Sequence, residues 1–307
     1  MSRGVRRTEA GIETVHGPSP VGESVRVRVT SAGICGSELH AVAGGPMPVV
    51  LGHEFGGRTD DGRLVAVMPY APCGTCPACA RGDEQLCPAG TRAFHGGTRD
   101  GGLADEVLVE PGSLVPVPAG VEPEAVGLVE PIAVAVHAIG RAPLAAGERA
   151  LVIRGGSIGL LCAAVLADRG LGVDLLARHR AQIRAAGAIG AATIAAGRNP
   201  VVVDAAGTAS SMERAVRMAE RGGRVVLVAL PWAPVPIGAA LVLKEVAVLP
   251  AGYYSRADFA DAAELLGRHP DLPGRLVTHR FGLEDAATAF AVAGDRAAGA
   301  IKVHLLP

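Results

Sequence analysis

Aromatic side chains are scarce in this 307-residue sequence and make up only 3% of it. Hydrophobic residues nevertheless reach 49%, so a core has to be built mainly from alanine, valine, leucine and isoleucine. Charged residues make up 19%, a balance that favours a folded chain over a disordered one. The formal net charge is -1 and no basic block occurs. Nucleic acid is therefore not expected as a partner.

The sequence also lacks the features that direct a chain to a membrane or through one. Three arginines lie within residues 1–11, but no apolar stretch follows them, so no secretory signal is predicted. The long uncharged run over residues 225–243 is interrupted by Pro231, Pro234 and Pro236. These prolines favour two strands and a loop over a membrane helix. We therefore expect no membrane partner and a cytoplasmic protein.

The length of the chain exceeds what one hydrophobic core usually serves, so two domains are expected. Residues 22–120 contain short alternating segments punctuated by glycine and proline, which is typical of β-structure. From about residue 122, apolar strands alternate with alanine-rich helical segments, a pattern that predicts a doubly wound parallel sheet. The predicted strands are 25–29, 64–67, 106–109, 151–153, 172–177, 201–203, 225–229 and 301–303, and the predicted helices are 158–168, 181–189, 211–220 and 256–266.

Four cysteines, Cys73, Cys76, Cys79 and Cys87, lie within fifteen residues. Without a secretory signal, such a cluster favours a metal over disulfides. Zinc takes four thiolates at tetrahedral corners, and short Cys-x-x-Cys turns bring the sulfurs together. Since the protein would fill all four positions, this zinc would be structural. The alternative is four free or disulfide-paired cysteines on a loop.

A second set of metal-binding residue types is spread over the first 130 positions: Cys35, His53, Glu54 and Glu130. Taken singly, Cys35 could be a small core residue, His53 a residue that caps a loop, and Glu130 an acid in the first turn of a helix. Together, a cysteine, a histidine and a carboxylate match a catalytic zinc site that keeps one coordination position open.

These motifs resemble the zinc-containing medium-chain dehydrogenase/reductase (alcohol dehydrogenase) family, and most of all its sorbitol/threonine dehydrogenase-like branch. The Cys-Gly-Ser, Gly-His-Glu, four-cysteine and Glu-Pro motifs occur in the family's order. The resemblance implies an α/β protein with a Rossmann-type doubly wound parallel sheet over residues 122–272. It also implies a β-rich GroES-like catalytic domain over residues 1–121 and 273–307, with a structural zinc lobe at about 72–88. A homo-oligomer, dimer or tetramer, is implied as well.

By this resemblance, Cys35 and His53 would hold a catalytic zinc, and either Glu54 or Glu130 would complete its ligands. Glu54 would thus belong to both the metal site and the catalytic machinery. Zinc is a Lewis acid that lowers the pKa of an alcohol, so that a hydride can pass to a nicotinamide ring. Two zinc ions per chain are expected, one catalytic and one structural.

The resemblance also implies a proton path from the metal site to solvent. Ser37 matches the family's relay hydroxyl, and His40 matches the outer relay base. The alternatives are a turn hydroxyl and a surface histidine. Glu38 stands where the family usually has aspartate, and its longer side chain leaves open whether it contacts a zinc ligand.

The turn after the strand 151–153 resembles the family's Gly-x-Gly-x-x-Gly motif, which places a pyrophosphate on a helix N-terminus. Gly156 and Gly159 match the second and third glycines, whereas Arg154 replaces the first. The motif is therefore broken, and the surrounding βαβ pattern supports the prediction more strongly. The predicted cofactor-binding residues of this turn are Gly155, Gly156, Ser157, Ile158 and Gly159.

The next strand ends at Ala177, where an NAD-selective site usually carries an acid that binds the ribose. Asp174 lies too early in the strand for this role. Arg178 and Arg180 could pair with the extra phosphate of NADP, which favours NADP over NAD. A solvated basic turn is the alternative.

The expected function is hydride transfer between a secondary alcohol, such as a polyol, a cyclitol or a hydroxy-amino compound, and NAD(P), with a ketone as the product or the substrate. One alternative is a zinc-stabilised nucleotide-binding protein without turnover, since Arg154 could block productive binding. Another is a zinc-assisted aldehyde reductase.

Overall fold

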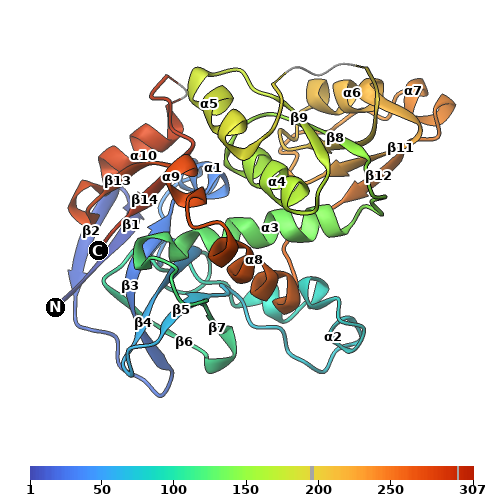
Figure 1. Ribbon diagram of the computed structural model, residues 1–307. Helices are drawn as coiled ribbons and strands as arrows, with labels where there is room; N and C mark the ends of the chain where they lie inside the picture. Colours follow the sequence, from blue (N-terminus) through green and yellow to red (C-terminus); the bar gives the residue numbers. More distant parts are fainter. Residues whose placement is uncertain (194–196, 296) are drawn as a thin grey trace. The chain divides into compact units, whose positions relative to one another are not determined.

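The computed structural model describes residues 1–193, 197–295 and 297–307 (Figure 1). The chain forms two compact units, Met1–Glu130 with Ser255–Pro307, and Pro131–Tyr254. These bounds differ from the expected ones at both junctions, because residues 122–130 and helix α8 (Arg256–Arg268) belong to the first unit rather than to the nucleotide-binding part. There α8 packs against strand β7 (Leu114–Pro116), and the Arg256 N–H donates to Glu84 at 2.8 Å. Alanine-rich periodicity predicts such a helix but not the sheet on which it packs.

The first unit is built around a sheet in the order β13-β14-β3-β4-β5-β7, with β6 also paired to β3. The alternation in β3 buries Val27 and Val29 and exposes Arg28, as a half-buried strand requires. The predicted strands 64–67 and 106–109 are confirmed. The strand predicted over 301–303 is observed at 302–305, beside β3. The strands are β3 (Val25–Gly33), β4 (Glu54–Thr59), β5 (Leu64–Val67), β6 (Glu106–Val109), β13 (Val277–Phe281) and β14 (Lys302–Leu305), with a separate hairpin of β1 (Ser2–Thr8) and β2 (Gly11–Gly17).

The two longest helices of this unit, α8 and α10, carry apolar residues toward the core, where Phe259, Leu266 and Phe290 are buried. Besides α8, the helix bounds of this unit are α1 (Gly36–Ala43), α2 (Pro77–Ala80), α9 (Leu272–Leu276) and α10 (Ala286–Gly294), with short 3-10 turns at η1 (Glu84–Leu86), η2 (Gly90–Arg92), η3 (Pro111–Ser113), η4 (Pro123–Leu128) and η5 (Leu283–Asp285).

The second unit contains a parallel sheet in the order β12-β11-β10-β8-β9, which confirms the predicted doubly wound sheet. The middle residues of its central strands, such as Leu151, Val202 and Val225, are apolar and fully buried, as expected where helices cover a parallel sheet. Helix α4 packs on β8 and β9, and α6 packs on β10 and β11. The bounds are β8 (Arg149–Ile153), α4 (Ser157–Asp168), β9 (Gly172–Leu176), α5 (Arg180–Ile189), β10 (Asn199–Asp204), α6 (Ala209–Met218), β11 (Ala219–Leu227), α7 (Ala239–Leu243) and β12 (Ala247–Pro250).

Two predicted elements of this unit were wrong in part. The helix predicted over 211–220 ends at Met218, because Ala219 is already extended and pairs with Asn199 of β10. The run over 225–243 holds one strand and then α7, rather than two strands. Alanine and leucine are strong helix formers, and the helix starts after Gly238, once the prolines have been passed.

Helix α3 (Val129–Gly140) follows directly on η4. Among the described residues, Pro123–Gly140 is the one helical stretch long and apolar enough to cross a membrane, with a mean hydropathy of 1.3. Since 72% of this stretch is buried in the fold, the same composition suits a core helix.

Candidate functional site

Strand pairing brings three of the predicted zinc ligands together. Cys35 follows the end of β3, and His53 and Glu54 stand at the start of β4, where Gly33 pairs with Glu54. One ligand atom from each of the three side chains lies within 4.8 Å of the others. A thiol, an imidazole and a carboxylate form a donor set that zinc accepts, with room for a fourth ligand. The residues present therefore fit a catalytic zinc.

The electrostatics of this cluster favour a cation. Burial alone would lower the pKa of His53, but the neighbouring Cys35 thiol and Glu38 carboxylate raise it well above its ordinary value. The groups around His53 therefore favour a positive charge at this position. A divalent cation would supply that charge, with His53 as a neutral imidazole ligand.

Glu38 reaches a predicted ligand despite its extra methylene group. Its carboxylate is buried and accepts hydrogen bonds from the N–H groups of Cys35, at 3.0 Å, and Gly52, at 2.6 Å. One of its oxygens lies 3.7 Å from His53 Nδ1. Burial alone would raise the pKa of Glu38, but His53 and the two N–H donors together lower it by more, so the net shift is downward. Glu38 therefore orients His53 and fixes the backbone around Cys35.

The two residues of the predicted proton path occupy different surroundings on α1. Ser37 Oγ donates a hydrogen bond to Cys35 Sγ at 3.2 Å, which places its hydroxyl at the metal cluster. His40 is exposed on the same helix. The structure thus brings Ser37 to the cluster and leaves His40 at the surface.

Glu130 is buried but does not belong to the group of three ligand atoms. Its charge acts on Lys302, whose pKa it helps to raise together with Glu54 and Cys35. Sequence reasoning missed Lys302, because a single lysine in a strand carries no motif. The tertiary contact with Glu54 is the only signal for it.

The four cysteines of the lobe form the second group whose ligand atoms lie within 4.8 Å of one another. No disulfide joins any of the six cysteines in the structure. Backbone N–H groups point at the sulfurs, from Cys76 to Cys73 at 3.3 Å and from Gly90 to Cys87 at 3.4 Å. The N–H groups and the hydroxyl around it lower the pKa of Cys73 to about 6. Four converging sulfurs with N–H donors fit a tetrahedral zinc.

The glycine-containing turn connects β8 to α4, as the sequence predicts. Gly159 has no room for a side chain, because an added Cβ would lie 1.9 Å from the carbonyl oxygen of Arg154. Arg154 itself has φ of +86°, the left-handed region that glycine tolerates best. The backbone therefore keeps the conformation of the missing first glycine, at a cost in strain. The hydroxyl of Ser157 is buried without a hydrogen-bond partner, which fits a site completed by a bound phosphate group.

The basic turn after β9 lies at the surface. Arg178 and Arg180 are both exposed, and Ala177 is half-buried at the end of the strand. Asp174 is buried and pairs with Arg149 at 2.6 Å. The structure therefore leaves no acid at the end of β9 and assigns Asp174 to a structural ion pair.

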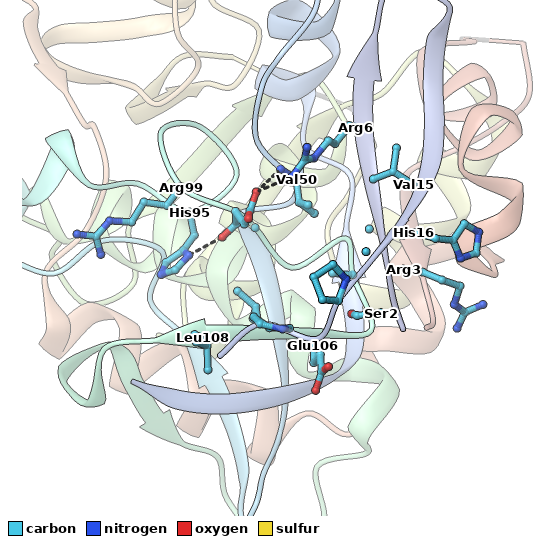
Figure 2. Close-up of a pocket in the computed structure, with 18 of the residues that line it drawn as sticks. Ser2, Arg3, Arg6, Val15, His16, Val50, His95, Arg99, Glu106 and Leu108 are labelled. Atoms are coloured by element: carbon cyan, nitrogen blue, oxygen red, sulfur yellow. Dashed lines mark hydrogen bonds and ion pairs between the residues drawn. The ribbon is translucent and has the colours of Figure 1, made fainter. Parts of the chain in front are cut away.

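A pocket of about 680 Å³ lies between the β1–β2 hairpin, β6 and the loop 95–101. Figure 2 shows His95 and Arg99 on one side of it and Arg3 and His16 on the other. Both signs of charge line the pocket. None of the predicted site residues is among its lining residues in the part of the chain that the structure describes, so it is separate from both cysteine clusters.

Comparison with known proteins gives matches over both units. Residues 22–119 match the alcohol dehydrogenase GroES-like domain, and residues 161–268 match the zinc-binding dehydrogenase family. The chain is 30% identical to 2-dehydro-3-deoxy-L-galactonate 5-dehydrogenase of Pseudoalteromonas atlantica, over 82% of each chain. A protein of Sinorhizobium meliloti assigned to the zinc-binding dehydrogenases and solved with NADP superimposes with a TM-score of 0.89, 28% identity and coverage of 100% and 99%. Galactitol-1-phosphate dehydrogenase of Escherichia coli gives a TM-score of 0.89 and 27% identity, with full coverage of both chains.

Proposed function

The chain belongs to the zinc-binding dehydrogenase family, as an NAD(P)-dependent zinc alcohol dehydrogenase with a GroES-like domain, and we propose that it oxidises a polyhydroxylated secondary alcohol to a ketone, or the reverse. The observation that supports this most directly is the buried group of Cys35, His53 and Glu54. Zinc bound there supplies a Lewis acid, which favours the ionised form of an alcohol at neutral pH.

The residues around the cluster have separate tasks in this proposal. Cys35 and His53 would hold the zinc, and Glu54 would be a third ligand that can exchange. Glu38 fixes the orientation of His53 through its contact with Nδ1. Ser37 Oγ would accept the hydroxyl proton of the alcohol while giving up its own proton toward solvent, and the exposed His40 would be the outer base that takes up that proton.

The four-cysteine group is proposed as a structural zinc site, which brings the expected content to two zinc ions per chain. The lobe contains only short helices, α2, η1 and η2, and no strand in the part of the chain that the structure describes. A metal that joins Cys73 to Cys87 would therefore supply the order that a hydrophobic core supplies elsewhere.

The nicotinamide cofactor is proposed to lie on the turn formed by residues 155–159. The buried hydroxyl of Ser157 and the close approach at Gly159 support this placement. NADP is favoured over NAD, because Arg178 and Arg180 are exposed at the end of β9 and no acid stands there. The relative from Sinorhizobium meliloti was solved with NADP.

The proposed substrate class follows from the named relatives, which act on a galactonate derivative and on galactitol 1-phosphate. We therefore favour polyols and sugar acids among the secondary alcohols. A homo-oligomer in the cytoplasm is also proposed. Oligomer formation is supported by exposed apolar side chains on the segment that joins β11 to β12, the edge strand of the parallel sheet among the described residues. They are Leu230, Trp232, Ile237, Val242 and Leu243.

A panel of polyols, sugar acids and their ketones, assayed with NAD and NADP, tests the proposal. Appearance of reduced nicotinamide absorbance with a polyol or a sugar acid is the expected result, and Cys35→Ala should show none. Absence of turnover with every secondary alcohol and ketone, in protein shown to contain both metals, would contradict it. Turnover confined to aldehydes would favour the aldehyde reductase instead.

A further inference from the structure

Lys302 is a buried cation beside the candidate catalytic zinc site. It is only 3% exposed, and it is one of two lysines in the chain, the other being Lys244. Its ammonium forms an ion pair with Glu54 Oε2 and donates a hydrogen bond to the carbonyl oxygen of Ile34 at 3.1 Å. Ile34 directly precedes Cys35. The ammonium is therefore anchored next to one proposed ligand and bound to another.

The order of strands explains how two distant residues meet. Strand β3 lies between β14, which carries Lys302, and β4, which carries Glu54. The residue of β3 between them is Gly33, which pairs with Glu54 on one side and with His304 on the other. A Cβ at Gly33 would lie 2.2 Å from Glu54 Oε2 and 3.0 Å from Lys302 Cε. The two side chains thus meet over a position that only glycine leaves open.

Lys302 and Glu54 are both buried, at 3% and 1% exposed. Two buried groups of opposite charge are stable only as a pair, since loss of either leaves the other unpaired in a poorly solvated place. A compact ammonium suits the narrow space over Gly33 better than a planar guanidinium does.

We propose that Lys302 is a positioning residue that holds one oxygen of Glu54 and thereby keeps Glu54 an exchangeable, rather than a permanent, ligand of the catalytic zinc. The inference rests on the proposed zinc site. Both Lys302 and the metal attract the same carboxylate, so neither binds it alone. Without Lys302, Glu54 would have the metal as its only cation and would close the coordination position that substrate needs.

Binding of imidazole to the cobalt-substituted protein tests this inference without catalysis. Imidazole is a neutral metal ligand, so removal of a nearby charge has little direct effect on it, and its binding changes the visible cobalt spectrum. The variants are Lys302→Met, Glu54→Gln and the double variant, with Lys244→Met as the matched control. Lys244 also donates to backbone carbonyls, at Val216 and Arg217, away from the cluster.

We expect Lys302→Met to weaken imidazole binding by about tenfold or more, because Glu54 then occupies the position. In the Glu54→Gln background the same change should alter the affinity by less than about threefold. Lys244→Met should match the wild type. An unchanged affinity in Lys302→Met, or an equal loss in both backgrounds, would overturn the inference.

Two further measurements keep the outcome decisive. Lys302→Gln can still donate to the Ile34 carbonyl but carries no charge, so it replaces Lys302→Met should that variant fail to fold. Cobalt content is determined first, in the wild type and in Cys35→Ala. If Cys35→Ala loses no metal, the proposed zinc site itself fails. If it loses one equivalent and the Lys302 variants behave as wild type, only the role of Lys302 fails.

Discussion

Two glycines of the turn between β8 and α4 differ in the space around them, and their alanine variants are expected to affect different properties: one the stability of the fold, the other the affinity for the cofactor. An added Cβ at Gly159 would lie 1.9 Å from the backbone oxygen of Arg154, whereas one at Gly156 would meet nothing within 4 Å. Gly156 also has φ of -72°, which any residue adopts. Gly159→Ala should therefore strain the folded protein, and Gly156→Ala should not.

The magnitudes follow from these contacts. A backbone oxygen cannot rotate away, so Gly159→Ala must move α4 from β8, and we expect a loss near the upper end of overpacking costs, about 3 kcal/mol. At roughly 2–4 °C for each kcal/mol, this lowers the melting temperature by about 6–12 °C. Gly156→Ala should change the free energy of unfolding by less than about 0.5 kcal/mol. Its methyl group would instead occupy space proposed for the pyrophosphate and weaken NADPH binding by about tenfold or more.

Thermal unfolding of the cofactor-free, zinc-loaded protein and fluorescence titration with NADPH separate the two effects. Gly156→Ala should lose affinity at nearly unchanged stability, and Gly159→Ala should lose stability. A Gly159→Ala variant that melts with the wild type would refute the close approach of α4 to β8. A Gly156→Ala variant that binds NADPH normally would refute the placement of the cofactor.

Three further predictions concern the metals, the cofactor and the fold. Cys35→Ala and Cys76→Ala should each remove about one zinc per chain. Cys35→Ala should abolish turnover at little cost in melting temperature, whereas Cys76→Ala should chiefly lower the melting temperature. If the two variants behave alike, the two sites do not have separate roles. Arg178→Ala should weaken NADPH by about tenfold and NADH by less than about threefold, and equal effects in direct titration would remove the selectivity for NADP. Although burial opposes it, the guanidinium of Arg3 lowers the pKa of Asp105 in the folded state. Asp105→Asn should therefore cost about 1 kcal/mol at pH 7, and the difference from wild type should shrink as the pH falls below about 4 in urea unfolding; a cost that is constant with pH would contradict the ion pair.

Much of the fold could be predicted, because its signals are local. Alternation with period two identifies a half-buried strand such as β3, and apolar runs between alanine-rich segments identify the parallel sheet. The errors arose where a local preference met a tertiary constraint. Ala219 and Glu220 suit a helix, yet pairing with β10 makes them a strand. Helix α8 was predicted within two residues of its end, but the unit to which it belongs was not.

The candidate site shows the same division. The spacing of Cys73, Cys76, Cys79 and Cys87 predicts a metal site, and the structure brings the four sulfurs within 4.8 Å of one another. Cys35 and His53 were predicted from resemblance, and the pairing of β3 with β4 supplies the geometry. The contact of Glu38 with His53 was left open from sequence, since one methylene group decides the reach and only the folded backbone shows it.

The sequence by itself determined the residue types available for zinc and nucleotide binding, and the order of strands and helices, because these depend on neighbours a few residues apart. Only the tertiary structure shows which carboxylate lies within 4.8 Å of the ligand atoms of Cys35 and His53, and which cation pairs with that carboxylate. Lys302 and the carbonyl oxygen that it binds are 268 residues apart in the chain. This contact requires that β14 lies beside β3. The neighbouring ion pair of Lys302 with Glu54 further requires a glycine in β3 that leaves space for both side chains. Both requirements depend on strand order and register, which no local sequence pattern encodes.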